Sequence, residues 1–240
     1  MNKIFHYELK RLVCSKFFAG ILVICLAYGW QVLSTRTILG VSSTAPFSPW
    51  SYGSYLSELL PLLGIILLFL VWNISSGNSL RVQPLILATP VSKSRYLLVK
   101  VMAAAVAWLA AALCTVLLGL AFLLFLFGGA VPVAVLLLLS VIILLPVLLF
   151  MLGLFLLGSR LHPLLPVLLL LILAALSQFF LPASADILGK SFFTNYPLEL
   201  GILDPPLSLP PSVIAGKLFY TIGGVGMCAA AALRYEEKKH

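Results

Sequence analysis

Six long apolar segments fill most of this 240-residue chain. A transmembrane helix needs about 20 apolar residues, because the hydrocarbon core of a bilayer is roughly 30 Å thick and each helical residue rises about 1.5 Å. The composition agrees, since 9% of the residues are charged, whereas a soluble domain has about a quarter. The sequence therefore predicts an all-α membrane protein, a single transmembrane domain over residues 1–240 with six transmembrane helices. The predicted spans are Phe17–Leu33, Leu59–Ile74, Val101–Phe127, Val131–Leu157, Leu164–Leu181 and Val213–Leu233.

The distribution of basic residues predicts how the chain is oriented. An even number of spans places both termini on one side, and twelve of the fifteen Lys and Arg residues then share that side. The other side receives Arg36, Lys190 and Lys217. Because cytoplasmic loops carry the excess of Lys and Arg, we expect a multi-pass protein of the plasma membrane with its N- and C-termini in the cytoplasm. The basic residues are scattered at membrane borders rather than gathered on one face, which argues against nucleic acid as a partner.

Residues 1–16 have the pattern of an amphipathic helix. Apolar side chains recur at helical spacing with basic residues between them, as is typical of a helix that lies in the cytoplasmic interface of the lipid bilayer and turns into the first span. The alternative is a basic flank that only orients this span. The residues of this predicted elbow helix are Ile4, Phe5, Leu9, Lys10, Arg11 and Leu12.

Small residues mark two predicted helix contacts. Ala103, Ala107, Ala111 and Gly119 recur at multiples of four residues along the third predicted span. Gly223 and Gly226 lie in the last span. Small side chains at such spacings allow helices to approach closely, and the partner helix belongs either to this chain or to another.

The two long segments on the outer side differ in their predicted structure. Trp50, Tyr52 and Tyr55 precede the second predicted span, where aromatic residues often form a belt at the membrane interface. The segment 182–212 holds aromatic and aliphatic residues and many prolines, and we expect short outer helices there before the last span.

The cytoplasmic segment 75–100 is the most informative stretch. Thr89-Pro90 breaks a preceding helix, because the residue before proline is driven out of the α region, and Ser92 can cap the helix that follows. Leu85 and Leu87 are apolar but lie outside the predicted bilayer. An exposed apolar patch rimmed by charge often marks a protein contact. Alternatively, the leucines lie in the membrane interface and the charges anchor the span. The residues of the predicted contact are Leu85, Leu87, Thr89, Pro90, Val91, Ser92, Lys93 and Arg95.

Motifs for catalysis are missing from the chain. The sequence has no G-x-x-x-x-G-K-[ST] loop for ATP and no H-E-x-x-H or G-x-S-x-G motif. The predicted spans hold no pair of ionisable residues at mid-bilayer depth that would suit a proton relay or an intramembrane enzyme. We therefore expect a chain that is not an enzyme and binds no cofactor or metal itself.

One stretch of the segment 75–100 resembles a known family. It is Leu85–Lys100, with the sequence LILATPVSKSRYLLVK. It is similar to the stretch between the second and third spans of ABC-2 type transporter permeases, the membrane subunits of bacterial ABC exporters. The six spans, the basic N-terminal helix and the long outer segment before the last span are also similar to that family. The chain departs from the family pattern in two places. Upstream of the motif the family often has an acidic residue and a Gly-Thr-like pair, and this chain has Asn78, Ser79 and Gln83-Pro84. Before the final Lys the family usually has Gly, and this chain has Val99.

The resemblance implies partners and an energy source. Two permease subunits would pair as a homodimer or heterodimer, and each would dock on a separate cytosolic ATPase that binds ATP and Mg. The segment 75–100 would then be the coupling segment that contacts the ATPase, and transport would be export. The apolar faces of the spans themselves suit a hydrophobic or amphiphilic substrate. The alternative function is a non-transport membrane scaffold or an immunity protein without an ATPase.

Overall fold

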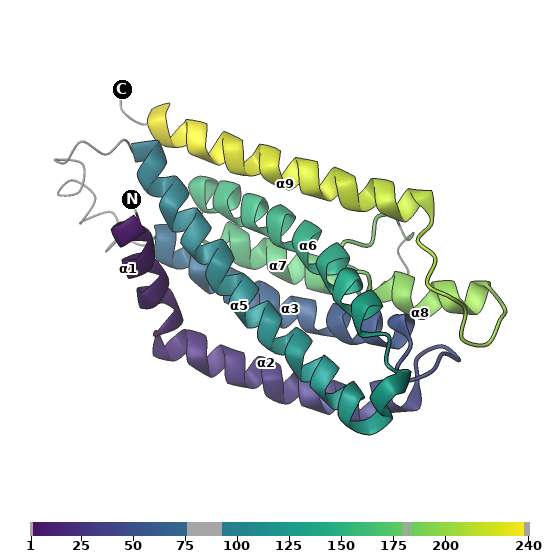
Figure 1. The fold of residues 1–240 in the computed structure, drawn as a ribbon. Coiled ribbons are helices and arrows are strands. Elements are labelled where there is room, and N and C mark those ends of the chain that lie inside the picture. The colour runs from purple at the N-terminus through teal and green to yellow at the C-terminus, as the bar shows by residue number, and fades with distance from the viewer. Residues whose placement is uncertain (1, 76–92, 180–181, 183, 238–240) are drawn as a thin grey trace.

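A computed structural model describes residues 2–75, 93–179, 182 and 184–237, and every regular element in these residues is a helix (Figure 1). The elements are α1 (Asn2–Val13), α2 (Lys16–Thr35), η1 (Thr37–Leu39), α3 (Pro49–Ser75), α5 (Lys93–Phe127), η2 (Gly128–Ala130), α6 (Val133–Leu161), α7 (Leu165–Leu176), α8 (Lys190–Glu199) and α9 (Pro211–Glu237). The prediction of an all-α protein is therefore confirmed for these residues.

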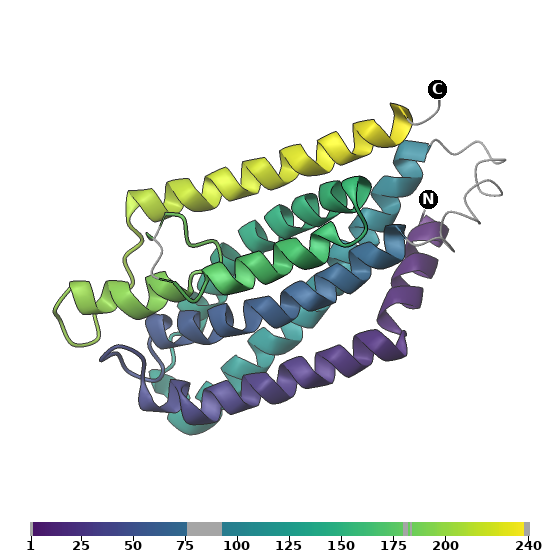
Figure 2. The ribbon, with the colours of Figure 1, turned by 180° about the vertical axis from the view of Figure 1, so that it is seen from behind.

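Five of the described helices are long and apolar enough to cross a membrane, which supports a membrane-embedded protein. They lie in α2, α3, α5, α6 and α9 and run alongside one another as a bundle (Figures 1 and 2). α1 begins, α3 ends, α5 begins and α9 ends at one end of this bundle, which we call the terminal end. The opposite, distal end holds α8 and the turn between α5 and α6.

The fifth predicted span differs from the structure. In place of a helix over Leu164–Leu181, the chain forms α7, which has 12 residues. At about 1.5 Å per residue α7 is roughly 18 Å long, well short of a bilayer core of about 30 Å. The helix tightens as it ends, because the Gln178 and Phe179 amides donate to carbonyls three residues back instead of four. The described residues thus hold five membrane-length helices and one short apolar helix, not six full spans.

The predicted N-terminal helix is present as α1, and it ends before Ser15. The Ser15 hydroxyl accepts a hydrogen bond of 3.2 Å from the Phe18 amide and so caps the start of α2. α1 crosses the terminal end of the bundle at a steep angle to α2 (Figure 1). Leu12 is buried, and Phe5 and Leu9 pack against the core, so these side chains contact protein. That α1 also lies in the membrane interface stays a prediction. Lys10 and Arg11 are exposed, and in this position they would face away from the rest of the protein.

The aromatic residues before the second predicted span lie inside the bundle rather than in a belt. α3 begins at Pro49, ten residues before the predicted span, so Trp50, Tyr52 and Tyr55 are part of the helix and are at most 1% exposed. Their polar atoms have partners from other elements: Tyr52 shares a hydrogen bond of 3.1 Å with Ser140, and Tyr55 donates to the Thr115 carbonyl at 2.8 Å. The prediction of an interface belt is wrong for these three residues.

Close helix contacts use some of the predicted small residues and not others. Ala103, Ala107 and Ala111 are fully buried along α5, and a Cβ atom on Gly119 would lie 2.7 Å from the Tyr55 ring. Cβ atoms on Gly223 and Gly226, in contrast, would meet nothing within 4 Å.

The tight contact of α9 lies instead at Gly224, whose Cβ would fall 2.6 Å from the backbone nitrogen of Phe150 on α6. Gly153 on α6 faces the same crossing, because its Cβ would lie 2.9 Å from the Met227 Cβ. The expected contact between the last span and another helix therefore exists, but it lies on a different face of α9.

Candidate functional site

A buried ion pair joins α1 to the beginning of α5. Glu8 and Lys100 are 5% and 3% exposed, and the Lys100 ammonium lies 4.0 Å from the Glu8 carboxylate. The other carboxylate oxygen of Glu8 is 2.8 Å from the Arg11 guanidinium, and the Lys100 ammonium lies 4.8 Å from the centre of the Tyr96 ring. A buried charge is costly unless it is paired, so these contacts hold α1 in a defined position on α5.

Glu8 was not among the predicted functional residues, although the sequence carries a signal for it. Phe5, Glu8 and Leu12 follow one another at three and four residues, so they share one side of α1. An acidic residue on the apolar side of an otherwise basic helix predicts a buried basic partner. Lys100 is the last residue of the stretch that resembles the ABC-2 permeases, and it supplies that partner.

Most of the predicted coupling residues lie outside the described part of the chain. This is true of Leu85, Leu87, Thr89, Pro90, Val91 and Ser92, and of the side chain of Lys93. α5 begins at Lys93, the residue after the predicted cap, and Arg95 is exposed. The structure therefore describes only the last part of the predicted coupling segment 75–100. α5 begins there at Lys93, and its contact with α1 lies seven residues further on, at Lys100.

A second cluster of charges lies at the distal end, on α3. The Glu58 carboxylate is 2.7 Å from Arg36 and 3.2 Å from the Lys190 ammonium, and it accepts a hydrogen bond of 3.5 Å from Tyr28. Lys190 also donates to Gln178 at 2.8 Å. One carboxylate thus connects α2, α3 and the beginning of α8, and two of the three basic residues assigned to the outer side by sequence meet here.

Aromatic packing holds the segment 182–212 against α3. This segment contains one described helix, α8, where several short helices were expected. Its Phe192 and Tyr196 rings lie 5.6 Å and 5.7 Å from the ring of Trp50. The Trp50 indole donates to the Pro205 carbonyl at 2.8 Å. A packed cluster of rings therefore joins α8 to α3 at the distal end.

In the described part of the chain, no group of three or more His, Cys, Asp and Glu side chains could hold a metal ion. The two charged clusters consist of ion pairs and hydrogen bonds between helices, so they hold the helices in position relative to one another.

No family model, curated protein or solved structure matches the chain. The described residues define an all-helical protein of the membrane type.

Proposed function

We propose that this chain is the membrane-spanning permease subunit of an ATP-driven transporter of the ABC-2 type, which exports a hydrophobic or amphiphilic substrate. In this proposal the chain lies in the plasma membrane of a bacterium with both termini in the cytoplasm. It pairs with a second permease subunit, and a separate cytosolic ATPase binds ATP and Mg.

One observation supports the proposal best: the α1–α5 contact is made by Lys100, the last residue of the predicted coupling segment 75–100. α3 ends at Ser75 and α5 begins at Lys93, both at the terminal end of the bundle. Lys100 on α5 binds Glu8 on α1, so a displacement of the segment would move α5 and α1 together. This arrangement suits a protein that converts movement of a cytosolic partner into movement of its membrane helices.

The proposal requires that the ATPase bind the apolar residues of the segment. We expect the tagged chain, co-expressed with the ATPase encoded nearest its gene, to co-purify with that ATPase and with ATP hydrolysis. Replacement of Leu85 and Leu87 by Asp should release the ATPase, because a charged carboxylate is costly to bury in an apolar contact.

Leu164→Asp is the matched control for this experiment. Leu164 is 61% exposed in the turn between α6 and α7, and this turn lies at the terminal end of the bundle (Figure 2). Leu164→Asp therefore places one carboxylate outside the predicted contact, for comparison with the single variants Leu85→Asp and Leu87→Asp. Retention of the ATPase in all variants would contradict the coupling role. A chain that elutes folded and alone after this co-expression would favour the scaffold or immunity function.

A further inference from the structure

The outer side of α1 is basic, and the one acidic residue of this helix points inward. Lys3, Lys10 and Arg11 are exposed on α1, and Lys16 is exposed just after it. Glu8 is 5% exposed, and its carboxylate is paired on the inner side of the helix. Lys3 and Lys10 are seven residues apart, which is close to two turns, so they lie on the same side of α1. The surface that α1 presents to its surroundings is therefore positively charged.

The apolar side of α1 is occupied by the protein itself. Phe5 and Leu12 follow Lys3 and Lys10 by two residues, so they lie nearly opposite these lysines. Leu12 is buried in the core, and Phe5 packs against it. An amphipathic helix at a membrane usually combines burial of its apolar side in lipid with attraction to anionic head groups. In this chain the apolar side packs on protein, so charge is the means by which α1 can bind a membrane.

Two connections place α1 at the border of the membrane-length helices. α1 ends at Val13, and the membrane-length part of α2 begins at Lys16. Further back, α1 is joined through Glu8 to Lys100, which stands directly before the apolar run that begins at Val101. α1 crosses the end of the bundle at a steep angle to α2 (Figure 1). In a bilayer that holds these apolar runs, α1 therefore lies along the layer of lipid head groups.

Exposed aromatic side chains adjoin the basic ones. Tyr7 is 67% exposed and lies between Lys3 and Lys10 on the same side of α1. Phe17, directly after Lys16, is 54% exposed. Aromatic rings are common at the border between membrane and water. An acidic protein surface would match the charges of this side of α1, whereas an anionic lipid surface matches the charges and the rings together.

The basic residues at the distal end of the bundle, in contrast, have partners within the chain. Arg36 and Lys190 are paired with the Glu58 carboxylate. The Lys217 ammonium donates to a backbone carbonyl at 2.8 Å, and the charge of Asp186 acts on it. These residues hold parts of the chain together, so the two ends of the bundle differ in the charge that they offer to an external partner.

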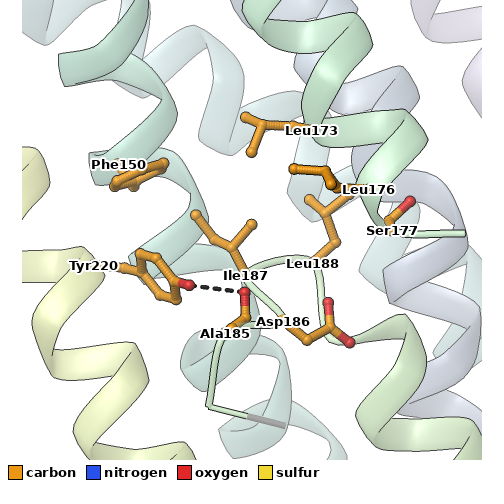
Figure 3. Close-up of a pocket in the computed structure, with 9 residues that line it drawn as sticks. All are labelled: Phe150, Leu173, Leu176, Ser177, Ala185, Asp186, Ile187, Leu188 and Tyr220. Atoms are coloured by element: carbon orange, nitrogen blue, oxygen red, sulfur yellow. Dashed lines mark hydrogen bonds between the residues drawn. The ribbon is translucent and has the colours of Figure 1, made fainter. Parts of the chain in front are cut away.

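The cavity of about 230 Å³ between α6, α7 and α9 has polar groups that are used in the same way (Figure 3). Figure 3 shows the Tyr220 hydroxyl donating to the Ala185 carbonyl, at 2.8 Å. The Asp186 carboxylate accepts hydrogen bonds from the amides of Gly189 and Phe192 at the beginning of α8. These bonds fix the segment before α8 on the bundle.

We propose that the outer side of α1 binds the head groups of anionic phospholipids in the surrounding membrane. Basic clusters beside a transmembrane helix attract anionic lipids in this way, and Lys3 and Lys10 are the residues that contact the head groups. The interaction is electrostatic and involves no insertion of the helix into the acyl chains. It goes beyond the proposed transport function and belongs to this chain alone, so its test needs no ATPase.

A fluorophore on Cys14 reports the lipids beside α1. Cys14 is exposed and one turn beyond Lys10. Cys114 and Cys228, which are partly exposed, are replaced by alanine, and the labelled protein is placed in nanodiscs of phosphatidylglycerol and phosphatidylcholine in equal amounts. One of the two lipids carries a nitroxide near its head group, which quenches fluorescence at short range. We expect stronger quenching when the nitroxide is on phosphatidylglycerol than when it is on phosphatidylcholine.

A label at the other end of α5 is the control for ordinary lipid contact. Phe125 is 88% exposed and lies in the stretch 101–159, which contains no charged residue. With the label on Phe125→Cys and Cys14 replaced by alanine, the two lipids should quench equally.

Variants of the two lysines test the assignment of the surface. Lys3→Gln and Lys10→Gln should each weaken the preference for phosphatidylglycerol, by about five-fold for each charge lost. Lys3→Arg and Lys10→Arg keep the charge at the same positions and should keep the preference. In 1 M salt the Debye length is about 3 Å, so the unmodified lysines should also lose the preference, and this measurement needs no substitution.

Three results would overturn the proposal. The first is equal quenching by the two lipids at Cys14. The second is a preference that persists in 1 M salt or in the double variant of Lys3→Gln and Lys10→Gln. The third is a double variant that keeps the lipid preference but no longer co-purifies with the ATPase, which would assign this side of α1 to a protein partner.

Discussion

Substitution of Gly224 by Ala should separate α9 from α6, whereas the same substitution one residue earlier should not. The added Cβ at Gly224 would lie 2.5 Å from the carbonyl oxygen of Leu149 and 2.6 Å from the nitrogen of Phe150. Ordinary contact begins at 3.4 Å. Both neighbours are backbone atoms, so they cannot move aside by a change of rotamer. The helices must therefore part by roughly 1 Å, and a gap of that size loses a quarter to a half of the attraction between the atoms concerned.

Overpacking of this kind costs about 1–3 kcal/mol. For a chain of this length, that corresponds to a decrease of about 2–12 °C in the melting temperature. Gly223→Ala and Gly226→Ala are the matched controls, because their Cβ atoms meet nothing within 4 Å. In these two variants the higher helix propensity of alanine acts alone, and the melting temperature should stay the same or rise.

The assay is the fraction of monodisperse protein that remains after heating in mild detergent, measured by size-exclusion chromatography for all three variants. Gly153→Ala, on the other side of the crossing, should behave like Gly224→Ala. If Gly224→Ala melts at the same temperature as Gly223→Ala, the close crossing of α6 and α9 is refuted.

Three further predictions address the two ends of the bundle. Glu8→Gln should lower the free energy of unfolding by about 1–3 kcal/mol, because the buried Lys100 loses its carboxylate; the double variant with Lys100→Met should recover part of this loss, and thermal melting measures both. Trp50→Phe keeps the ring packing but removes the hydrogen bond to Pro205, so we expect a loss of about 1 kcal/mol and faster proteolysis between α8 and α9, with Trp30→Phe as the control. The exposed Cys14 should react with a membrane-impermeant maleimide in inside-out vesicles and not in intact cells, and the reverse pattern would contradict cytoplasmic termini.

Hydropathy predicted the helices well where a long apolar run coincided with one straight helix. The predicted spans ending at Ile74 and Phe127 end within a residue of α3 and α5. This agreement has a simple cause, because polar or glycine residues follow each run directly and a helix of about 20 apolar residues matches the bilayer.

Hydropathy could not reveal the short helix α7. The polar pair Ser177-Gln178 follows α7 directly, but the apolar run resumes at Phe179. The hydropathy of Leu164–Leu181 as a whole therefore does not show that the helix ends at Leu176. The deciding contacts are the turns after Leu176 and the packing of segment 184–188, and both depend on tertiary structure.

The sequence also could not predict which small residues of α9 face α6. Gly223 and Gly224 are adjacent, yet successive residues of a helix point about 100° apart, so one faces α6 and the other faces away. The rotation of α9 about its axis is set by all of its contacts. Similarly, Trp50 and Tyr55 have the composition of an interface belt, and only the early start of α3 places them inside the bundle.

α5 has 35 residues and contains no proline, which distinguishes it mechanically from α3 and α6. At about 1.5 Å per residue it is a continuous rod roughly 52 Å long, whereas α3 and α6 each contain an internal proline, at Pro61 and Pro146, where a helix can bend. A rod of this length acts as a lever. If its terminal end tilts by about 5°, its far end sweeps about 4–5 Å, so a small push on α1 and α5 is enlarged by geometry alone before it reaches the turn at Gly128.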